Sequence, residues 1–99
     1  MNGEEAAVGQ RRVRWLVSGR VQGVSFRYFT RQNAQRLGLA GWVRNRPDGT
    51  VEAVVEGPEN VLADLRREIQ QGPPMARVLG IEETVAPTGE LPSLFEIHF

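Results

Sequence analysis

Apolar and polar side chains alternate between residues 12 and 18. Val13, Trp15 and Val17 occupy every second position there, and a period of two is typical of a strand with one buried face. From residue 25 to residue 37 the apolar spacing changes to three and four, which predicts an amphipathic helix. The apolar stripe of this helix contains Phe26, Phe29, Thr30, Ala34 and Leu37.

The predicted helix carries signals at both of its ends. Ser25 suits the N-cap position, and Gly38 suits the position that follows the C-cap. Asn33 is a polar residue at the spacing of the apolar stripe, and the pattern assigns it no role.

The pattern after residue 40 predicts a hairpin, a second helix and two further strands. The hairpin joins strands at 41–46 and 50–56 through the turn residues Arg-Pro-Asp-Gly, and it places Trp42 and Val43 on opposite faces. The second helix starts within residues 57–59 and stops at the Gly-Pro-Pro of residues 72–74. Strands follow at 76–85 and 94–99, with a loop between them.

This order, β-α-β-β-α-β with one extra short C-terminal strand, is that of an α+β ferredoxin-like sandwich. The fold class predicts an antiparallel sheet with both helices on one face. The 99 residues suffice for one domain with one core. We therefore expect a disordered N-terminal lead at residues 1–11 and a single domain at residues 12–99.

The amino-acid composition limits the compartment in which we expect the protein and the kinds of site that it can contain. The chain has no cysteine, which excludes a disulfide framework and a thiolate metal site. No segment approaches the roughly 18 apolar residues that a membrane span requires, and the N-terminus lacks the apolar run of a secretory signal. We expect a cytoplasmic monomer that has no metal or other cofactor and does not contact a membrane.

Charge is distributed unevenly although the net charge is zero. Residues 6–47 contain nine arginines and no Asp or Glu, whereas the chain from Asp48 onward contains ten acids and three arginines. There is no lysine, and the planar fork of donors on arginine matches phosphate and carboxylate oxygens. An anionic partner for the first half fits this pattern, and so does ordinary solvated charge.

The segment GRVQGVSFR, residues 19–27, joins the first strand to the first helix. Its two glycines permit backbone conformations in which successive N–H groups converge on an anion, and the helix N-terminus adds partial positive charge. Arg27, in the first helical turn, adds a two-pronged donor. The segment matches neither the Walker A nor the dinucleotide-binding glycine pattern. A phosphate cradle and a tight strand-to-helix connection both fit it.

A second polar group, Asn45 in the segment GWVRNRPDGTVE, stands at the end of the second strand. In this fold, that end can lie near the loop after the first strand. A neutral amide there can hold a water by donating and accepting hydrogen bonds. It can also shape the turn that follows.

Together, GRVQGVSFR and GWVRNRPDGTV closely resemble the acylphosphatase family, and GPPMARV at residues 72–78 resembles that family's approach to its fourth strand. The resemblance covers residues 12–99. It implies a ferredoxin-like fold and metal-independent hydrolysis of acyl phosphates to a carboxylate and inorganic phosphate. It identifies Arg27 as the catalytic arginine and Asn45 as the water-orienting asparagine. The phosphate-binding residues that it implies are Arg20, Val21, Gln22, Gly23, Val24, Ser25, Phe26 and Arg27.

The C-terminus departs from the family pattern. Members of the family often end in Phe-x-Ile-Arg-Tyr, whereas this chain ends in Phe-Glu-Ile-His-Phe. The change replaces an arginine with His98 and a tyrosine with Phe99, which weakens the case for a polar contact from this end, and it leaves both active-site motifs intact. We expect His98, the only histidine, to be an exposed edge residue and not a catalyst.

Two alternatives fit the same order of elements. RNA-recognition domains stack bases on aromatic residues of their central strands, but the third strand here, TVEAVVE, has two acids and no aromatic residue. We therefore expect no nucleic-acid partner. The other alternative is a non-catalytic domain that binds anions without turnover. The presence of both Arg27 and Asn45 favours the enzyme.

Overall fold

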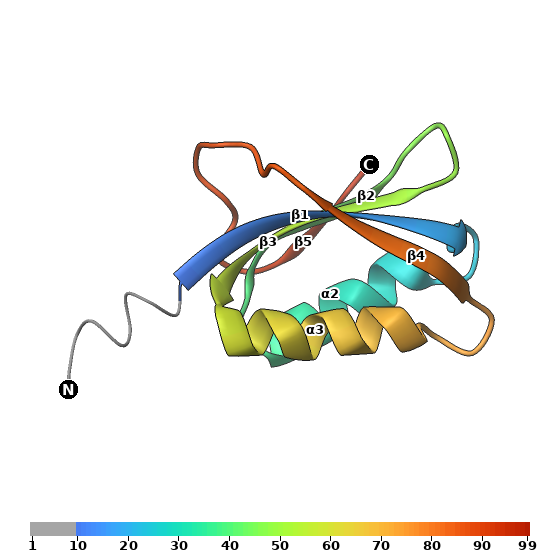
Figure 1. Cartoon of the computed structure of the whole chain (residues 1–99), viewed down its shortest axis with the longest axis horizontal. Helices are drawn as coiled ribbons and strands as arrows, with labels where there is room; N and C mark the ends of the chain where they lie inside the picture. Colours follow the sequence, from blue (N-terminus) through green and yellow to red (C-terminus); the bar gives the residue numbers. More distant parts are fainter. Residues whose placement is uncertain (1–9) are drawn as a thin grey trace.

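The computed structural model describes residues 10–99. Figure 1 shows two helices together on one face of a five-stranded sheet. In chain order the elements are β1 (Gln10–Arg20), α2 (Phe26–Arg36), β2 (Ala40–Asn45), β3 (Val51–Pro58), α3 (Glu59–Gln71), β4 (Arg77–Thr84) and β5 (Glu96–His98). The strand order β4-β1-β3-β2-β5 confirms the predicted ferredoxin-like sandwich with an extra C-terminal strand.

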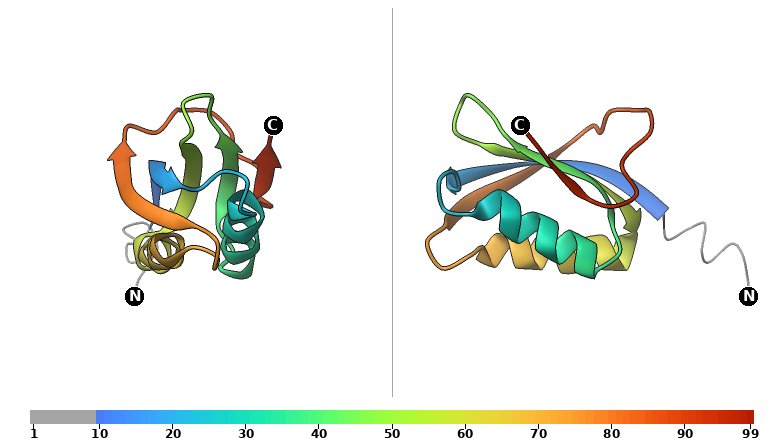
Figure 2. Two further views of the ribbon diagram at one scale, coloured as in Figure 1. Left: turned by 90° about the vertical axis from the view of Figure 1, so that its right-hand side faces the viewer. Right: turned by 180° about the vertical axis from the view of Figure 1, so that it is seen from behind.

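The extra C-terminal strand, whose direction the sequence pattern left open, makes the sheet mixed. β3 pairs antiparallel with β1 and β2, and β4 pairs antiparallel with β1, but β5 runs parallel to β2. The chain after β4 leaves one edge of the sheet and returns at the opposite edge. It therefore enters the sheet in the direction of β2, as the left view of Figure 2 shows.

The start of β1 corrects the predicted disordered lead. Gln10 and Arg11 pair with Pro58 and Gly57 of β3, so the prediction for residues 1–11 is wrong for these two residues. The physical reason is that β3 extends to Pro58 and offers β1 a hydrogen-bonding partner beyond the stretch of apolar alternation. Residues 1–9 lie outside the described residues.

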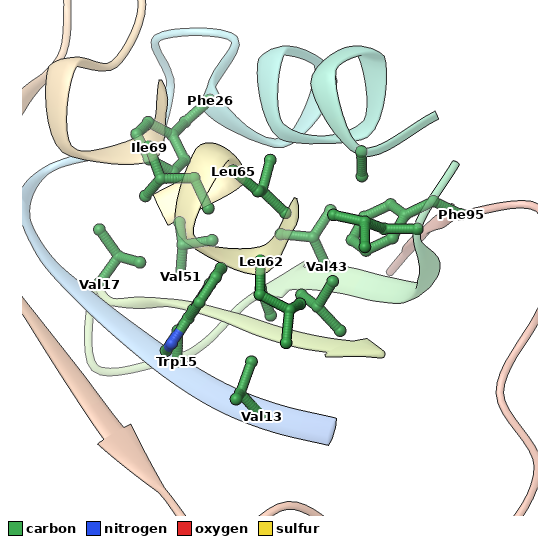
Figure 3. Close-up of a cluster of buried hydrophobic side chains, with 14 of the residues drawn as sticks. Val13, Trp15, Val17, Phe26, Val43, Val51, Leu62, Leu65, Ile69 and Phe95 are labelled. Carbon is green, nitrogen blue, oxygen red and sulfur yellow. The ribbon is translucent and has the colours of Figure 1, made fainter. Parts of the chain in front are cut away.

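The core lies between the sheet and the two helices. Val13, Trp15 and Val17 of β1 are buried, as their alternation predicted. Figure 3 shows Phe26 of α2 beside Ile69 of α3, above the inward side chains of the sheet. The buried helix positions are Phe26, Thr30, Ala34, Leu62, Leu65 and Ile69. Within residues 10–99, neither helix is long and apolar enough to cross a membrane.

Helix α2 ends at Arg36 with Leu37 as its C-cap, and Gly38 follows the C-cap as predicted. This glycine has a φ of 73°, a left-handed conformation that favours glycine. The Leu39 N–H then donates to the Ala34 carbonyl at 2.9 Å and closes the last turn. Asn33 is accommodated on the helix itself, because its Nδ2 donates to the Phe29 carbonyl at 3.0 Å.

The face of the sheet opposite the helices carries a buried carboxylate. Glu52 of β3 is 4% exposed and accepts hydrogen bonds from Arg14 Nε at 2.5 Å and from Arg44 Nε at 2.6 Å. Arg14 also donates to Thr84 Oγ1 at 2.9 Å. Burial alone would raise the pKa of Glu52, but the hydrogen bonds from the two arginines outweigh it and lower the pKa. This network joins strands β1 to β4 on the face that no helix covers.

We expect Glu52→Gln to lower the free energy of unfolding at pH 7 by about 1–3 kcal/mol, because a neutral amide cannot replace two charge-assisted hydrogen bonds. Urea denaturation measures this loss.

Glu52→Gln should also change how the free energy of unfolding depends on pH in the acid range. Because folding lowers the pKa of Glu52, its stabilisation is present above the ordinary glutamate value of about 4.3 and is lost as the pH falls through the folded value. The Glu52→Gln protein should therefore lose less stability than the wild type between about pH 5 and pH 3. Equal losses in the two proteins would contradict this role for the carboxylate.

Candidate active site

The loop between β1 and α2 crosses the end of the sheet (Figure 2). Gly23 and Ser25 have positive φ values of 74° and 63°, and Val24 between them does not. Such alternation turns successive backbone N–H groups toward one side of the chain, as in anion-binding nests. The loop backbone is therefore suited to hold a phosphate-sized anion.

Ser25 occupies the N-cap position of α2, as predicted, but its side chain makes no cap hydrogen bond. A capping serine needs an extended backbone, whereas the left-handed φ turns this hydroxyl away from the helix. A non-glycine residue in that conformation costs about 1–3 kcal/mol, which is typical of functional loops.

The backbone N–H groups at the N-terminus of α2 therefore receive no hydrogen-bond acceptor from a capping side chain. The first helical hydrogen bond runs from the Phe29 N–H to the Ser25 carbonyl at 3.0 Å, so the N–H groups of residues 26–28 have no helical acceptor. The first turn also contains no acidic residue. These donors and the helix dipole favour an anion at this end.

Arg27 projects from the first turn of α2, and its guanidinium carbon lies 4.9 Å from the centre of the Phe99 ring. Across residues 10–99, no carboxylate forms an ion pair with Arg27. A cation that lies over an aromatic face keeps its in-plane N–H groups available. The contact with the exposed Phe99 ring therefore leaves the charge of the guanidinium uncompensated.

Asn45, the last residue of β2, lies at the same edge. β2 and β5 pair in parallel up to Arg44 and His98, so the next residue, Phe99, continues beside Asn45. Phe99 also contacts Arg27, so the residue that follows β5 lies beside one of the two predicted catalytic residues. The expected edge position of His98 is also borne out, since β5 is the last strand of the sheet.

Gln22 joins the loop to the β2–β3 turn. Its Nε2 donates to the carbonyl oxygens of Arg46 and Thr50, both at 2.8 Å. The Arg46 N–H also donates to the Thr50 carbonyl at 2.9 Å, so the glutamine docks on the residues that close the hairpin. This tether sets the distance between the loop and Asn45. Sequence reasoning placed Gln22 in the loop but missed this role, because its partners lie more than twenty positions away.

The other predicted loop residues contribute differently. Val21 and Phe26 bury their side chains in the core, so their backbone groups are the parts that a ligand can reach. Arg20 is the last residue of β1 and pairs with Arg77, which places it on the β4 side of the loop. Arg27 and Asn45 therefore belong to segments that meet at one edge of the sheet, and Arg20 belongs to the β1–β4 pair.

The acidic side chain nearest the site along the chain, that of Asp48, has hydrogen-bond partners of its own. Asp48, in the turn after β2, accepts hydrogen bonds from Thr50 Oγ1 at 2.6 Å and Thr50 N–H at 3.0 Å. The side-chain hydrogen bond from Thr50 is the main cause that lowers the pKa of Asp48. In the part of the chain that the structure covers, no group of three or more His, Asp or Glu side chains could hold a metal ion.

A cavity of about 810 Å³ lies on the helix-free face of the sheet, and Arg14, Arg44 and Glu52 line it. Both of its arginines donate to the Glu52 carboxylate. Their charge is therefore partly compensated, in contrast to that of Arg27.

The fold and the site define a small α+β domain that offers a helix N-terminus, a nest-like loop and one uncompensated arginine to an anion. The family model described as Acylphosphatase matches residues 13–97. The acylphosphatase of Rubrobacter xylanophilus is 52% identical over 96 residues, which cover 97% of this chain and 87% of the relative. The acylphosphatase of Anaeromyxobacter dehalogenans is 54% identical over 89 residues, which cover 89% and 95%.

A solved structure agrees with these relatives. The crystal structure of acylphosphatase from Bacillus subtilis has a TM-score of 0.82 and 43% identity to this chain, and the match covers 89% of this chain and 98% of that one. The chain belongs to the acylphosphatase family.

We expect Gln22→Met, which keeps the length of the side chain but removes both donated hydrogen bonds, to loosen the loop from the hairpin. Two carbonyl groups then lose a partner, which should lower the free energy of unfolding by about 1–2 kcal/mol. Affinity for inorganic phosphate should fall by several-fold, because the loop is no longer held in its binding conformation. Calorimetric titration and a thermal melt measure the two effects. An unchanged phosphate affinity would contradict the tether.

Proposed function

We propose that this protein is an acylphosphatase that cleaves the carboxyl–phosphate bond of acyl phosphates, releasing a carboxylate and inorganic phosphate. The observation that carries the proposal is the meeting of three features at one edge: the uncapped N-terminus of α2, the unpaired Arg27 and the amide of Asn45. Membership of the acylphosphatase family supports the same activity.

In the proposed mechanism, the backbone N–H groups of the loop and the guanidinium of Arg27 bind the phosphoryl oxygens. Phosphoryl transfer proceeds through a loose transition state with charge spread over those oxygens, so fixed donors stabilise it directly. The carboxylate leaving group needs little protonation. Catalysis by this site therefore depends on position and charge more than on a strong base.

The amide of Asn45 orients a water in line with the bond that breaks. A water oxygen–phosphorus bond forms while the bond from phosphorus to the acyl oxygen breaks, and the electron pair leaves with the carboxylate. The Asp48 carboxylate accepts a hydrogen bond from Thr50 within its turn, and His98 lies in the edge strand β5. We assign the proton of the attacking water to an oxygen of the phosphoryl group itself.

The direct test is hydrolysis of benzoyl phosphate by the purified protein, with and without excess EDTA. We expect the same turnover in both, because the proposed groups are all protein side chains and backbone. Phosphate binding without turnover would favour the non-catalytic alternative. Activity that vanished with EDTA and returned with Mg²⁺ would contradict the mechanism.

We further propose that the protein acts as a monomer in the cytoplasm. The groups assigned to the site come from a single chain, which supports the monomer. Acyl phosphates form by phosphoryl transfer inside cells, which supports the cytoplasm. Light scattering across the concentrations used for kinetics tests the oligomeric state, and a dimer with full activity only above its dissociation constant would overturn the first claim.

Arg27→Lys should lower kcat/KM on the order of 10²-fold. Lysine keeps the positive charge but loses the planar pair of donors and the stacking on Phe99. Arg31→Lys is the matched control, because Arg31 lies one turn further along α2 and stacks on Tyr28 instead. If the Arg27→Lys protein were as active as this control, charge alone would suffice at the site.

Asn45→Ala should separate chemistry from binding. We expect its kcat to fall on the order of 10²-fold, because a misplaced water loses the advantage of position, while its affinity for inorganic phosphate stays near that of the wild type. Arg27→Ala should lose both together. Asn33→Ala is the control, since Asn33 bonds only within its own helix region. Equal loss of phosphate affinity in Asn45→Ala and Arg27→Ala would show that Asn45 binds the anion itself.

A further inference from the structure

Two buried polar atoms lack a hydrogen-bond partner within residues 10–99, and both lie near the proposed site. They are Oγ1 of Thr30, a residue with 0% exposure, and Oδ1 of Asn45. A buried polar group without a partner costs about 1–3 kcal/mol. Threonine in a helix commonly bonds back to a carbonyl of the preceding turn, but Thr30 does not. Two such atoms on neighbouring elements point to a shared partner.

The direction of Thr30 around the helix places it toward β2. An α-helix turns about 100° per residue, so Thr30 lies about 40° from Phe26 and Arg27 lies about 100° from Phe26. Phe26 points into the core beside Ile69 (Figure 3), and Arg27 points to Phe99 at the end of β5. Thr30 therefore points between the core and the β5 edge. The strand in that interval is β2, against which α2 packs.

The height of Thr30 along the helix agrees with this direction. Thr30 lies about 4.5 Å further along the axis than Arg27. Side chains on a helix tilt toward its N-terminus, so the hydroxyl reaches back toward the level of Arg27. Asn45 stands near that level too, because β2 and β5 pair up to Arg44 and His98, and Phe99, the residue after His98, contacts the Arg27 guanidinium.

We infer that Thr30 is a positioning residue for the reaction: its hydroxyl and the Asn45 Oδ1 share one buried water that fixes the orientation of the amide. This inference rests on the proposed role of Asn45. Neither atom has a protein partner, so the link between them runs through water, which readily makes two to four hydrogen bonds in a polar site. With Oδ1 held inward, Nδ2 is the end of the amide that faces the attacking water.

The inference gives Thr30 a role in the chemical step that is distinct from phosphate binding and from packing of the core. Thr30 does not belong to the loop that grips the phosphate, so its hydroxyl should affect kcat and not phosphate affinity. Removing the hydroxyl should weaken the fold only slightly, because its partner is a water and not a group of the protein. The pair of substitutions Thr30→Val, which keeps the shape, and Thr30→Ser, which keeps the hydroxyl, tests both points.

We expect Thr30→Val to lower kcat on the order of tenfold at unchanged phosphate affinity, because the amide loses its fixed orientation. Thr30→Ser should recover most of the rate. Thr84→Val, which removes a threonine hydroxyl on the helix-free face, should match the wild type in kcat. Wild-type kcat in Thr30→Val would overturn the inference while leaving the proposed function intact.

A double substitution shows whether Thr30 acts through Asn45. In the Asn45→Ala background, Thr30→Val should cause no further loss of kcat, since the group that it positions is absent. Additive losses would overturn the inference.

An NMR readout keeps the test independent of turnover. The side-chain amide signals of Asn45 should shift in Thr30→Val and stay near wild-type positions in Thr84→Val. If the wild type failed to hydrolyse benzoyl phosphate, the proposed function would fall, and these signals would still decide whether Thr30 and Asn45 are linked. Unchanged Asn45 signals would refute that link.

Discussion

The parallel course of β1 and β2, each hydrogen-bonded to β3 between them, controls the position of the site. Parallel strands end at the same edge of a sheet, so the loop after β1 and the amide at the end of β2 meet there. Helix α2 starts at the same edge and directs its unpaired N–H groups and Arg27 toward it. The proposed chemistry needs fixed donors and few reactive groups, and this arrangement supplies them from short segments.

Side chains from distant parts of the chain then fix the distances within the site. Gln22 ties the loop to the hairpin that follows Asn45, and Phe99 contacts Arg27 from the end of β5. On the other face of the sheet, the Glu52 carboxylate forms ion pairs with Arg14 and Arg44 and partly compensates their charge. Arg27, by contrast, forms no ion pair with a carboxylate of residues 10–99 and keeps its positive charge at the start of α2.

Sequence patterns predicted the elements because these depend on local order, and alternation identified β1. The resemblance of the two motifs to the acylphosphatase family pointed to Arg27 and Asn45, whose catalytic roles stay predictions. The backbone of Ser25, the docking of Gln22 and the contact of Phe99 could not be predicted in this way, because each depends on partners that only the folded chain brings close. The parallel entry of β5 was missed for a similar reason: short strands carry no signal of direction, and the connection from β4 decides it.

A crystal structure of the protein with bound inorganic phosphate tests the central claim, that the loop, Arg27 and Asn45 form one phosphoryl site. The account predicts phosphate oxygens within hydrogen-bond distance of the loop N–H groups and of the Arg27 guanidinium, with the Asn45 amide nitrogen facing the phosphorus from the open side. Phosphate bound between Arg14 and Arg44 on the helix-free face, with none at the loop, would contradict it.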